Sequence, residues 1–135
     1  MIIEIKKLPF IKITEVAKMM GLSESYTYTL AKMPSCPFVC KKIGKRVVVH
    51  TKSFVDWYLK VSDVDEEDVD KYLVDDKLFF TAVEIAKLLK VSKTVAYEFL
   101  NDENCPFDCI MIGKRKIVSV AAFYKWYMEC DTKVS

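Results

Sequence analysis

The chain is poor in the residues on which most catalytic and nucleotide-binding motifs depend. It contains one histidine, three glycines and four prolines in 135 residues. The single histidine, His50, has no partner at the spacing of a catalytic constellation, and no glycine-rich loop that could cradle a phosphate is present. We therefore expect a protein without catalysis, cofactor or small-molecule substrate, in which His50 caps a helix or lies at the surface.

Long hydrophobic runs are also absent. No apolar stretch approaches the length of a membrane span, and the first residues lack the order of a secretory signal. These absences predict a soluble, cytoplasmic protein with no membrane partner, whose five cysteines are reduced thiols. The pairs Cys36/Cys40 and Cys105/Cys109 are spaced unlike common zinc knuckles. We expect small buried hydrophobic side chains there and no metal, with a zinc site as the lesser alternative.

The chain does contain an internal repeat with an offset of 69 positions. Residues 10–60 align with residues 79–129 without a gap, and 18 of the 51 pairs are identical. Two copies are too few for a stacked solenoid, so each copy should bury a core of its own, built largely from its aromatic side chains. We expect two domains, residues 1–61 and residues 78–135, joined by an acidic linker over residues 62–77.

The net charge of +2 is unevenly distributed. Residues 1–60 carry eleven basic and four acidic side chains, residues 61–78 two and eight, and residues 79–135 eight and seven. This asymmetry favours a polyanion as partner of the first copy more than of the second, although surface lysines also serve solubility alone. The acidic segment is expected to be a solvated connector. A short helix capped by Ser62 or Asp63 could lie within it.

The buried side chains expected in the connector are Val69, Tyr72 and Leu73.

Each copy should begin with two short helices. In the second copy Thr81 and Glu84 form a capping box, whereas the first copy has Lys12 at the capping position. The apolar stripe of this opening helix consists of Val16, Ala17, Met19 and Met20, or Ile85, Ala86, Leu88 and Leu89.

Ser23 and Ser92 are placed to cap the second helix of each pair after a tight turn. Two helices so arranged predict a helix-turn-helix, whose second helix is free to enter the major groove of DNA. Its expected inward residues are Leu22, Tyr26, Thr27 and Leu30, or Val91, Val95, Ala96 and Phe99. Its outward residues are Glu24, Ser25, Tyr28, Thr29 and Lys32, or Lys93, Thr94, Tyr97, Glu98 and Asn101. A solvated helix face explains any one outward residue as well as base contact does.

Prolines end these helices, and a β-hairpin and a third helix follow. Gly44-Lys45 is the expected two-residue turn, in which glycine supplies a positive φ. The basic residues of the hairpins are Lys42, Lys45 and Arg46 in the first copy and Lys114, Arg115 and Lys116 in the second. Such cations fit a phosphate backbone or merely blunt a strand edge. The aromatic residues expected in the core from the third helix are Phe54, Trp57 and Tyr58, or Phe123, Trp126 and Tyr127.

Taken in order, these residues resemble the small winged-helix domain of phage and transposon excisionases, which is related to the DNA-binding domain of MerR-type regulators. In the second copy the resemblance rests on residues 84–92, Tyr97, residues 105–107, residues 112–115 and residues 123–126. In the first copy it rests on residues 15–17, Ser23, Tyr28, residues 43–46 and Trp57. It covers nearly the whole chain apart from the ends and the linker.

The resemblance implies a mainly α fold with small β-hairpin wings, an α+β arrangement of tandem winged helix-turn-helix domains. It implies binding to double-stranded DNA, as a transcriptional regulator or a recombination accessory (directionality) factor. Relatives usually have Arg or Lys where the first copy has Glu24, and free excisionases are normally single units. An alternative is therefore a protein-interaction module that docks a recombinase (integrase), a regulator or another copy of itself, with one or both units not binding DNA.

Overall fold

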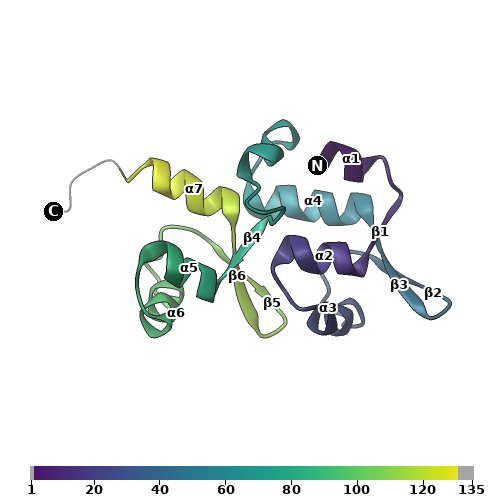
Figure 1. The fold of residues 1–135 in the computed structure, drawn as a ribbon, viewed down its shortest axis with the longest axis horizontal. Helices are drawn as coiled ribbons and strands as arrows, with labels where there is room; N and C mark the ends of the chain where they lie inside the picture. Colours follow the sequence, from purple (N-terminus) through teal and green to yellow (C-terminus); the bar gives the residue numbers. More distant parts are fainter. Residues whose placement is uncertain (1, 131–135) are drawn as a thin grey trace.

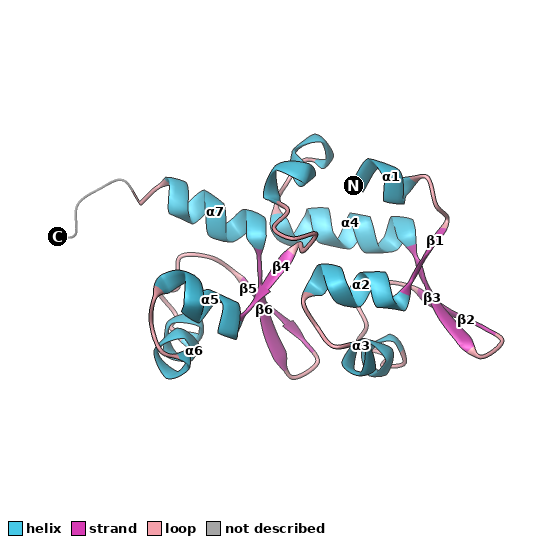
Figure 2. Cartoon of the chain, in the orientation of Figure 1, coloured by secondary structure: helices cyan, strands magenta, loops and turns pink. Residues whose placement is uncertain are grey.

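The computed structural model describes residues 2–130 and shows a mixed α+β fold with two three-stranded antiparallel sheets (Figures 1 and 2), which confirms the expected α+β class. One order of elements occurs twice. The first unit contains β1 (Phe10–Lys12), α2 (Ile13–Met20), α3 (Glu24–Ala31), β2 (Cys40–Ile43), β3 (Arg46–His50) and α4 (Thr51–Ser62). The second unit contains β4 (Phe79–Thr81), α5 (Ala82–Leu89), α6 (Lys93–Asn101), β5 (Cys109–Ile112), β6 (Arg115–Ser119) and α7 (Val120–Met128). Helix α1 (Ile2–Lys6) precedes the first unit, and a 3-10 helix, η1 (Glu66–Tyr72), connects the two.

The helix starts lie where the capping residues predict them. The Glu84 N–H donates to Thr81 Oγ1 at 3.4 Å, and the Thr81 N–H donates to Glu84 Oε1 at 3.1 Å, so the capping box is confirmed. Ser23 and Ser92 accept from the backbone three residues ahead, whereas Lys12 gives no side-chain cap. Local hydrogen bonding therefore fixes the pair of helices in each unit.

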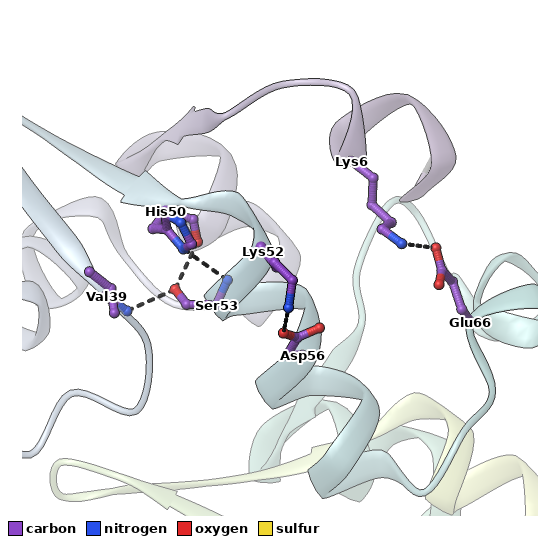
Figure 3. A network of polar contacts seen from close by, with 7 residues as sticks. All are labelled: Lys6, Val39, His50, Lys52, Ser53, Asp56 and Glu66. Carbon is purple, nitrogen blue, oxygen red and sulfur yellow. Dashed lines mark hydrogen bonds and ion pairs between the residues drawn. The ribbon is translucent and has the colours of Figure 1, made fainter.

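A histidine takes the same role at the start of α4. The Ser53 N–H donates to His50 Nδ1 at 3.1 Å, and the Ser53 hydroxyl donates to the His50 carbonyl at 2.8 Å (Figure 3). The Val39 N–H donates to Ser53 Oγ at 2.9 Å, which ties the start of α4 to the loop before β2. The expected capping role of His50 is confirmed. Ser119 takes the equivalent position before α7.

Each sheet consists of a hairpin and one strand from the start of its unit, in the orders β1-β3-β2 and β4-β6-β5. Ile43 pairs with Arg46, so the first hairpin has the expected two-residue turn. Gly44 and Gly113 have φ of 62° and 60°, the left-handed region that glycine enters without steric cost. The sequence pattern of the first copy predicts a strand over residues 38–43, but the strand begins at Cys40, and its counterpart begins at Cys109.

Each copy has a buried core as expected, but the core of the first unit is not independent of the second. The second unit has a separate cluster that consists of Phe80, Ala82, Ile85, Leu100, Phe107, Val118, Val120 and Phe123. The cluster of the first unit extends across the boundary between the units, and we call it the shared core. Leu78, Phe79 and Ile112 from the second half lie in the same buried cluster as the core of the first unit. The Phe79 ring stacks on Trp57 and meets Tyr58 edge to face, each with ring centroids 5.5 Å apart. A unit of about fifty residues buries only about 60% of the surface that its unfolded chain exposes, so burial against a neighbour adds stability to a marginal fold.

The connector also differs from the expectation. Helix α4 continues through Ser62, and Asp63 takes a left-handed conformation that ends it, so neither residue caps a following helix as predicted. The 3-10 helix instead starts after Asp65, which makes no side-chain cap. Val69 is buried as expected, but Val64 is buried too, and both lie in the core cluster of the first unit. The connector also contacts α7 through η1. An ion pair between Lys6 and Glu66 joins α1 to η1 (Figure 3).

Four side chains of the second unit that were expected to be buried are exposed. They are Leu88, Val91, Val95 and Tyr127. Their counterparts in the first unit lie on the face that packs against the second unit, and residues 2–130 contain no third unit to cover the second in turn. In the first unit, by contrast, all four predicted stripe residues of α2 are buried. No helix in this described part of the chain combines the length and apolar character needed to cross a membrane.

Candidate nucleic-acid interface

Helices α3 and α6 and both hairpins lie along one edge of the molecule (Figure 1). Their order along this edge is α6, the β5–β6 hairpin, α3 and the β2–β3 hairpin. Helices α1 and α4 lie on the opposite side, together with η1. The predicted DNA-contact residues of the first copy and those of the second copy therefore belong to neighbouring elements on one side of the protein. We call this side the basic edge, defined by α3, α6 and residues 40–50 and 109–119.

In the first unit every predicted contact residue is exposed. Glu24, Ser25, Tyr28, Thr29 and Lys32 lie on the exposed side of α3, and Lys42, Lys45 and Arg46 are exposed in the hairpin. The Thr29 hydroxyl donates to the Ser25 carbonyl at 3.1 Å and is thereby occupied within the helix. Nothing lies within 4 Å of the position of a Cβ at Gly44, so the tip of this hairpin projects into open space.

In the second unit the structure brings five predicted residues together around a cleft of about 730 Å³. The five are Tyr97, Asn101, Lys114, Arg115 and Lys116, and they share the cleft with Gly21 and Leu22 of the first unit. Lys93 and Thr94 are exposed at the start of α6 but do not line the cleft. Lys116 Nζ donates to Asn101 Oδ1, so these two side chains bind each other across the cleft.

The tip of the second hairpin does not project freely, because it docks onto α3. The Tyr26 hydroxyl donates to the Ile112 carbonyl at 2.7 Å and accepts from the Lys114 N–H at 2.9 Å. The Arg115 guanidinium lies 5.0 Å from the centroid of the Tyr26 ring, a cation–π contact. The side chains of Lys114 and Arg115 nevertheless remain exposed. The hairpin therefore connects the two units and still presents its charges on the basic edge.

Sequence reasoning missed two residues of this region. Tyr26 was expected inside its own unit, but it contacts the other one. The sequence does hold a sign of this contact. Tyr26 has a phenol hydroxyl at an apolar position, and such a hydroxyl needs a polar partner when it is buried. The second copy has Val95 at this position and therefore has no such hydroxyl. Lys41 is a further exposed cation on β2. Its counterpart is Ile110, which packs against the shared core. A lysine in the first hairpin and an isoleucine in the second therefore indicate that the first hairpin is free and the second is docked.

The cysteine pairs lie beside the hairpins and not within the cleft. Cys36 Sγ and Cys40 Sγ are 3.9 Å apart, and their hydrogen bond lowers the pKa of Cys36 to about 7 while it raises the pKa of Cys40. Burial raises the pKa of Cys109 to about 11. All four paired cysteines, Cys36, Cys40, Cys105 and Cys109, are only half-buried, less than expected. Among residues 2–130 no three His, Cys, Asp or Glu side chains are grouped as a metal site.

Comparisons of the chain with protein-family models, with curated proteins and with solved structures find no match.

Proposed function

We propose that the chain is a tandem winged helix-turn-helix protein that binds double-stranded DNA without catalysis, as a transcriptional regulator or a recombination accessory factor. In this proposal α3 and α6 are the recognition helices, and the two hairpins are the wings. Each recognition helix contacts base edges in the major groove, and the wing cations contact phosphates beside it.

The observation that carries the proposal is the continuity of the basic edge. Both exposed helices and both hairpins lie on one side of the molecule (Figure 1). The β2–β3 hairpin, which carries Lys45 and Arg46, lies on one side of α3, and the β5–β6 hairpin lies on the other (Figure 1). In the second hairpin the Arg115 guanidinium packs over the Tyr26 ring of α3. A helix flanked by cations is suited to the major groove, where base edges lie between two phosphate backbones.

The shared core strengthens this reading because it sets the distance between the recognition helices. Phe79 packs on Trp57 and Tyr58 of the first unit, and the Tyr26 hydroxyl binds the second hairpin. A duplex would therefore meet α3 and α6 at one spacing and not at a range of spacings allowed by a flexible linker. DNA sites with the two half-sites moved apart should bind more weakly.

The experiment is fluorescence anisotropy with labelled duplexes across a salt series. Replacing Lys45 and Arg46 by alanine removes two phosphate contacts, so the slope of log Kobs against log[salt] should become shallower by about two. The matched control removes two cations from α4, with Lys52→Ala and Lys60→Ala. It should leave the slope unchanged, because α4 lies away from the basic edge. If both double variants changed the slope equally, the binding would depend on the net charge of the protein and not on the position of the cations, and the wing would have no part in it.

A second candidate is that only the first unit reads DNA and the second acts as a protein-interaction module. The observations that favour it are the docked tip of the second hairpin and the pairing of Asn101 with Lys116. Halves of the chain cannot decide this cleanly, because each would expose part of the shared core. In the full chain, Lys93→Ala with Lys114→Ala decides it: a shallower salt slope places the second unit on DNA, and an unchanged slope favours the interaction module.

A further inference from the structure

The contact between the two units joins different surfaces of one repeated structure. The first unit contributes an acceptor face, made of Met19, Leu22, Tyr26, Trp57 and Tyr58. The second unit contributes an inserted face, made of Leu78, Phe79, Ile112, Ile117 and Ala121, with Gly113 against Tyr26. Because the units are repeats, each face has a copy that this contact leaves unused: an acceptor face on the second unit and an inserted face on the first.

The unused acceptor face is apolar and open. Leu88, Val91, Val95 and Tyr127 are 43%, 38%, 47% and 57% exposed, and they occupy the positions of Met19, Leu22, Tyr26 and Tyr58. The unused inserted face is open as well and carries both apolar and basic side chains, with Lys52 at the position of the buried Ala121. Phe10 and Ile43 are 42% and 63% exposed, whereas their counterparts Phe79 and Ile112 are 0% and 2% exposed in the contact between the units. Phe10 contacts the His50 ring and Tyr127 contacts the Tyr124 ring, but in the described residues no other unit covers either face.

The charges that differ between the copies are complementary. In the contact between the units, residues 110–113 lie along a groove with Ser35, Pro37 and Trp57. In the unused inserted face, Lys41 and Lys42 replace Ile110 and Met111. In the unused acceptor face, the loop equivalent to residues 33–35 has become Asp102, Glu103 and Asn104. The two lysines would therefore dock beside a loop that carries two carboxylates, at the positions where the first unit has Met33 and Pro34.

We propose that the partner of these surfaces is a second copy of this chain, whose first unit docks on the second unit of its neighbour and repeats the contact seen between the units. Such an interface is heterologous, because it joins two different faces. Each added copy leaves one acceptor face and one inserted face free. The product is an open-ended head-to-tail chain or a closed ring, and not a symmetric dimer.

The contact between copies lacks some of the polar interactions of its internal template. The Leu78 N–H donates to the Met19 carbonyl at 2.7 Å, but the counterpart of Leu78 is Pro9, which has no N–H. Val95 lacks the hydroxyl with which Tyr26 binds the second hairpin. The association is therefore weaker than the internal contact and depends on protein concentration.

The docking does not depend on DNA and does not block the basic edge. Lys114 and Arg115 stay exposed although their hairpin is docked on α3. Their counterparts Lys45 and Arg46 would stay exposed in the same way. Measurements without DNA therefore test the self-association by itself, and a failure of DNA binding would not overturn it.

Sedimentation velocity of the full chain without DNA is the test. At concentrations up to about 1 mM, the weight-average mass should rise with concentration beyond that of a dimer, and less so at high salt. Ile43→Glu spoils the inserted face and Val95→Glu spoils the acceptor face, so each variant alone should remain a monomer. An equal mixture of the two should form dimers and nothing larger, because each variant keeps the face that the other has lost.

Two further variants keep the result interpretable. Val39→Glu places a charge on another exposed apolar residue, at a position where the second unit has an exposed Asp108, and should leave the association unchanged. Val95→Tyr restores the phenol of the internal contact and should tighten association about tenfold, the effect of one to two net hydrogen bonds. A wild-type chain that stays monomeric, or a mixture of the two glutamate variants that stays monomeric, would overturn the proposal. Dimers formed by either glutamate variant alone would do so as well.

Discussion

Tyr26 shows at the scale of one residue how two similar units became one molecule. A phenol hydroxyl both donates and accepts, so it binds the Ile112 carbonyl and the Lys114 N–H at the same time. Its ring supports the Arg115 guanidinium. Valine at the equivalent position of the second unit can do none of this. The second hairpin is therefore held on α3, while the first hairpin remains free.

Cys36 offers a residue-scale prediction that depends on pH. Its pKa of about 7 arises from the hydrogen bond with Cys40, whereas burial raises the pKa of Cys109 to about 11. The thiolate is the reactive form, so iodoacetamide should modify Cys36 much faster than Cys109 at pH 7.5. Its rate should rise with pH through about 7 and then level off. Peptide-level mass spectrometry over a pH series measures both rates.

The control for this measurement is Cys40→Ala. Without the Cys40 thiol, the hydrogen bond that stabilises the Cys36 thiolate is lost, and the rate should level off only at a higher pH. Equal rates for Cys36 and Cys109 near neutral pH would contradict this account of the pair. A profile that does not change in the Cys40 variant would contradict it too.

At the scale of elements, the starts of the helices could be predicted because their causes are local. Ser23, Ser92 and the Thr81/Glu84 box each bind the backbone within three residues, and the turn glycines act within the hairpins themselves. The sequence therefore contains the whole interaction. The same locality explains why His50 could be assigned a capping role from its position before α4 alone.

The faces of the elements could not all be predicted, because burial depends on which copy packs against which. Leu88 and Met19 occupy equivalent helical positions, yet only Met19 is covered by a neighbouring unit. The helical spacing of apolar residues predicts burial for both of them equally. The exposed side of α3 was predicted correctly because Ser25 and Lys32 are polar. The contact of Tyr26 with the second hairpin is long-range and was missed.

Two equivalent glycines give an element-scale prediction about the docked hairpin. Gly44→Ala and Gly113→Ala place a Cβ at the same left-handed backbone conformation, which should cost each variant about 1 kcal/mol of unfolding free energy. Only at Gly113 would the new Cβ collide with the Tyr26 hydroxyl. The Gly113 variant should therefore be less stable than the Gly44 variant by a further ~1–3 kcal/mol.

Urea denaturation followed by tryptophan fluorescence compares the two variants, since Trp57 lies in the shared core. Combining each variant with Tyr26→Phe separates the cause, because removal of the hydroxyl should relieve most of the extra cost at Gly113 and none at Gly44. Equal stabilities of the two glycine variants would show that the hairpin is not docked on α3 in solution.

At the scale of the whole molecule, the shared core makes the two units behave as one body. Phe79 is fully buried, although it begins the second unit, and it packs on rings from α4. Lys125 of α7 donates to the Asp63 carbonyl at 2.6 Å and ties α7 to the end of α4. The basic edge is therefore a single surface, with its helices and hairpins at defined positions.

The most direct test of this account is an amide chemical-shift titration of the full chain with a short duplex at low salt. The account predicts perturbations in α3, α6 and the turns at Gly44 and Gly113, with α1, α4 and η1 unchanged. Perturbations centred on α4 and η1, or no perturbation at a salt concentration where non-specific binding should be strong, would contradict it.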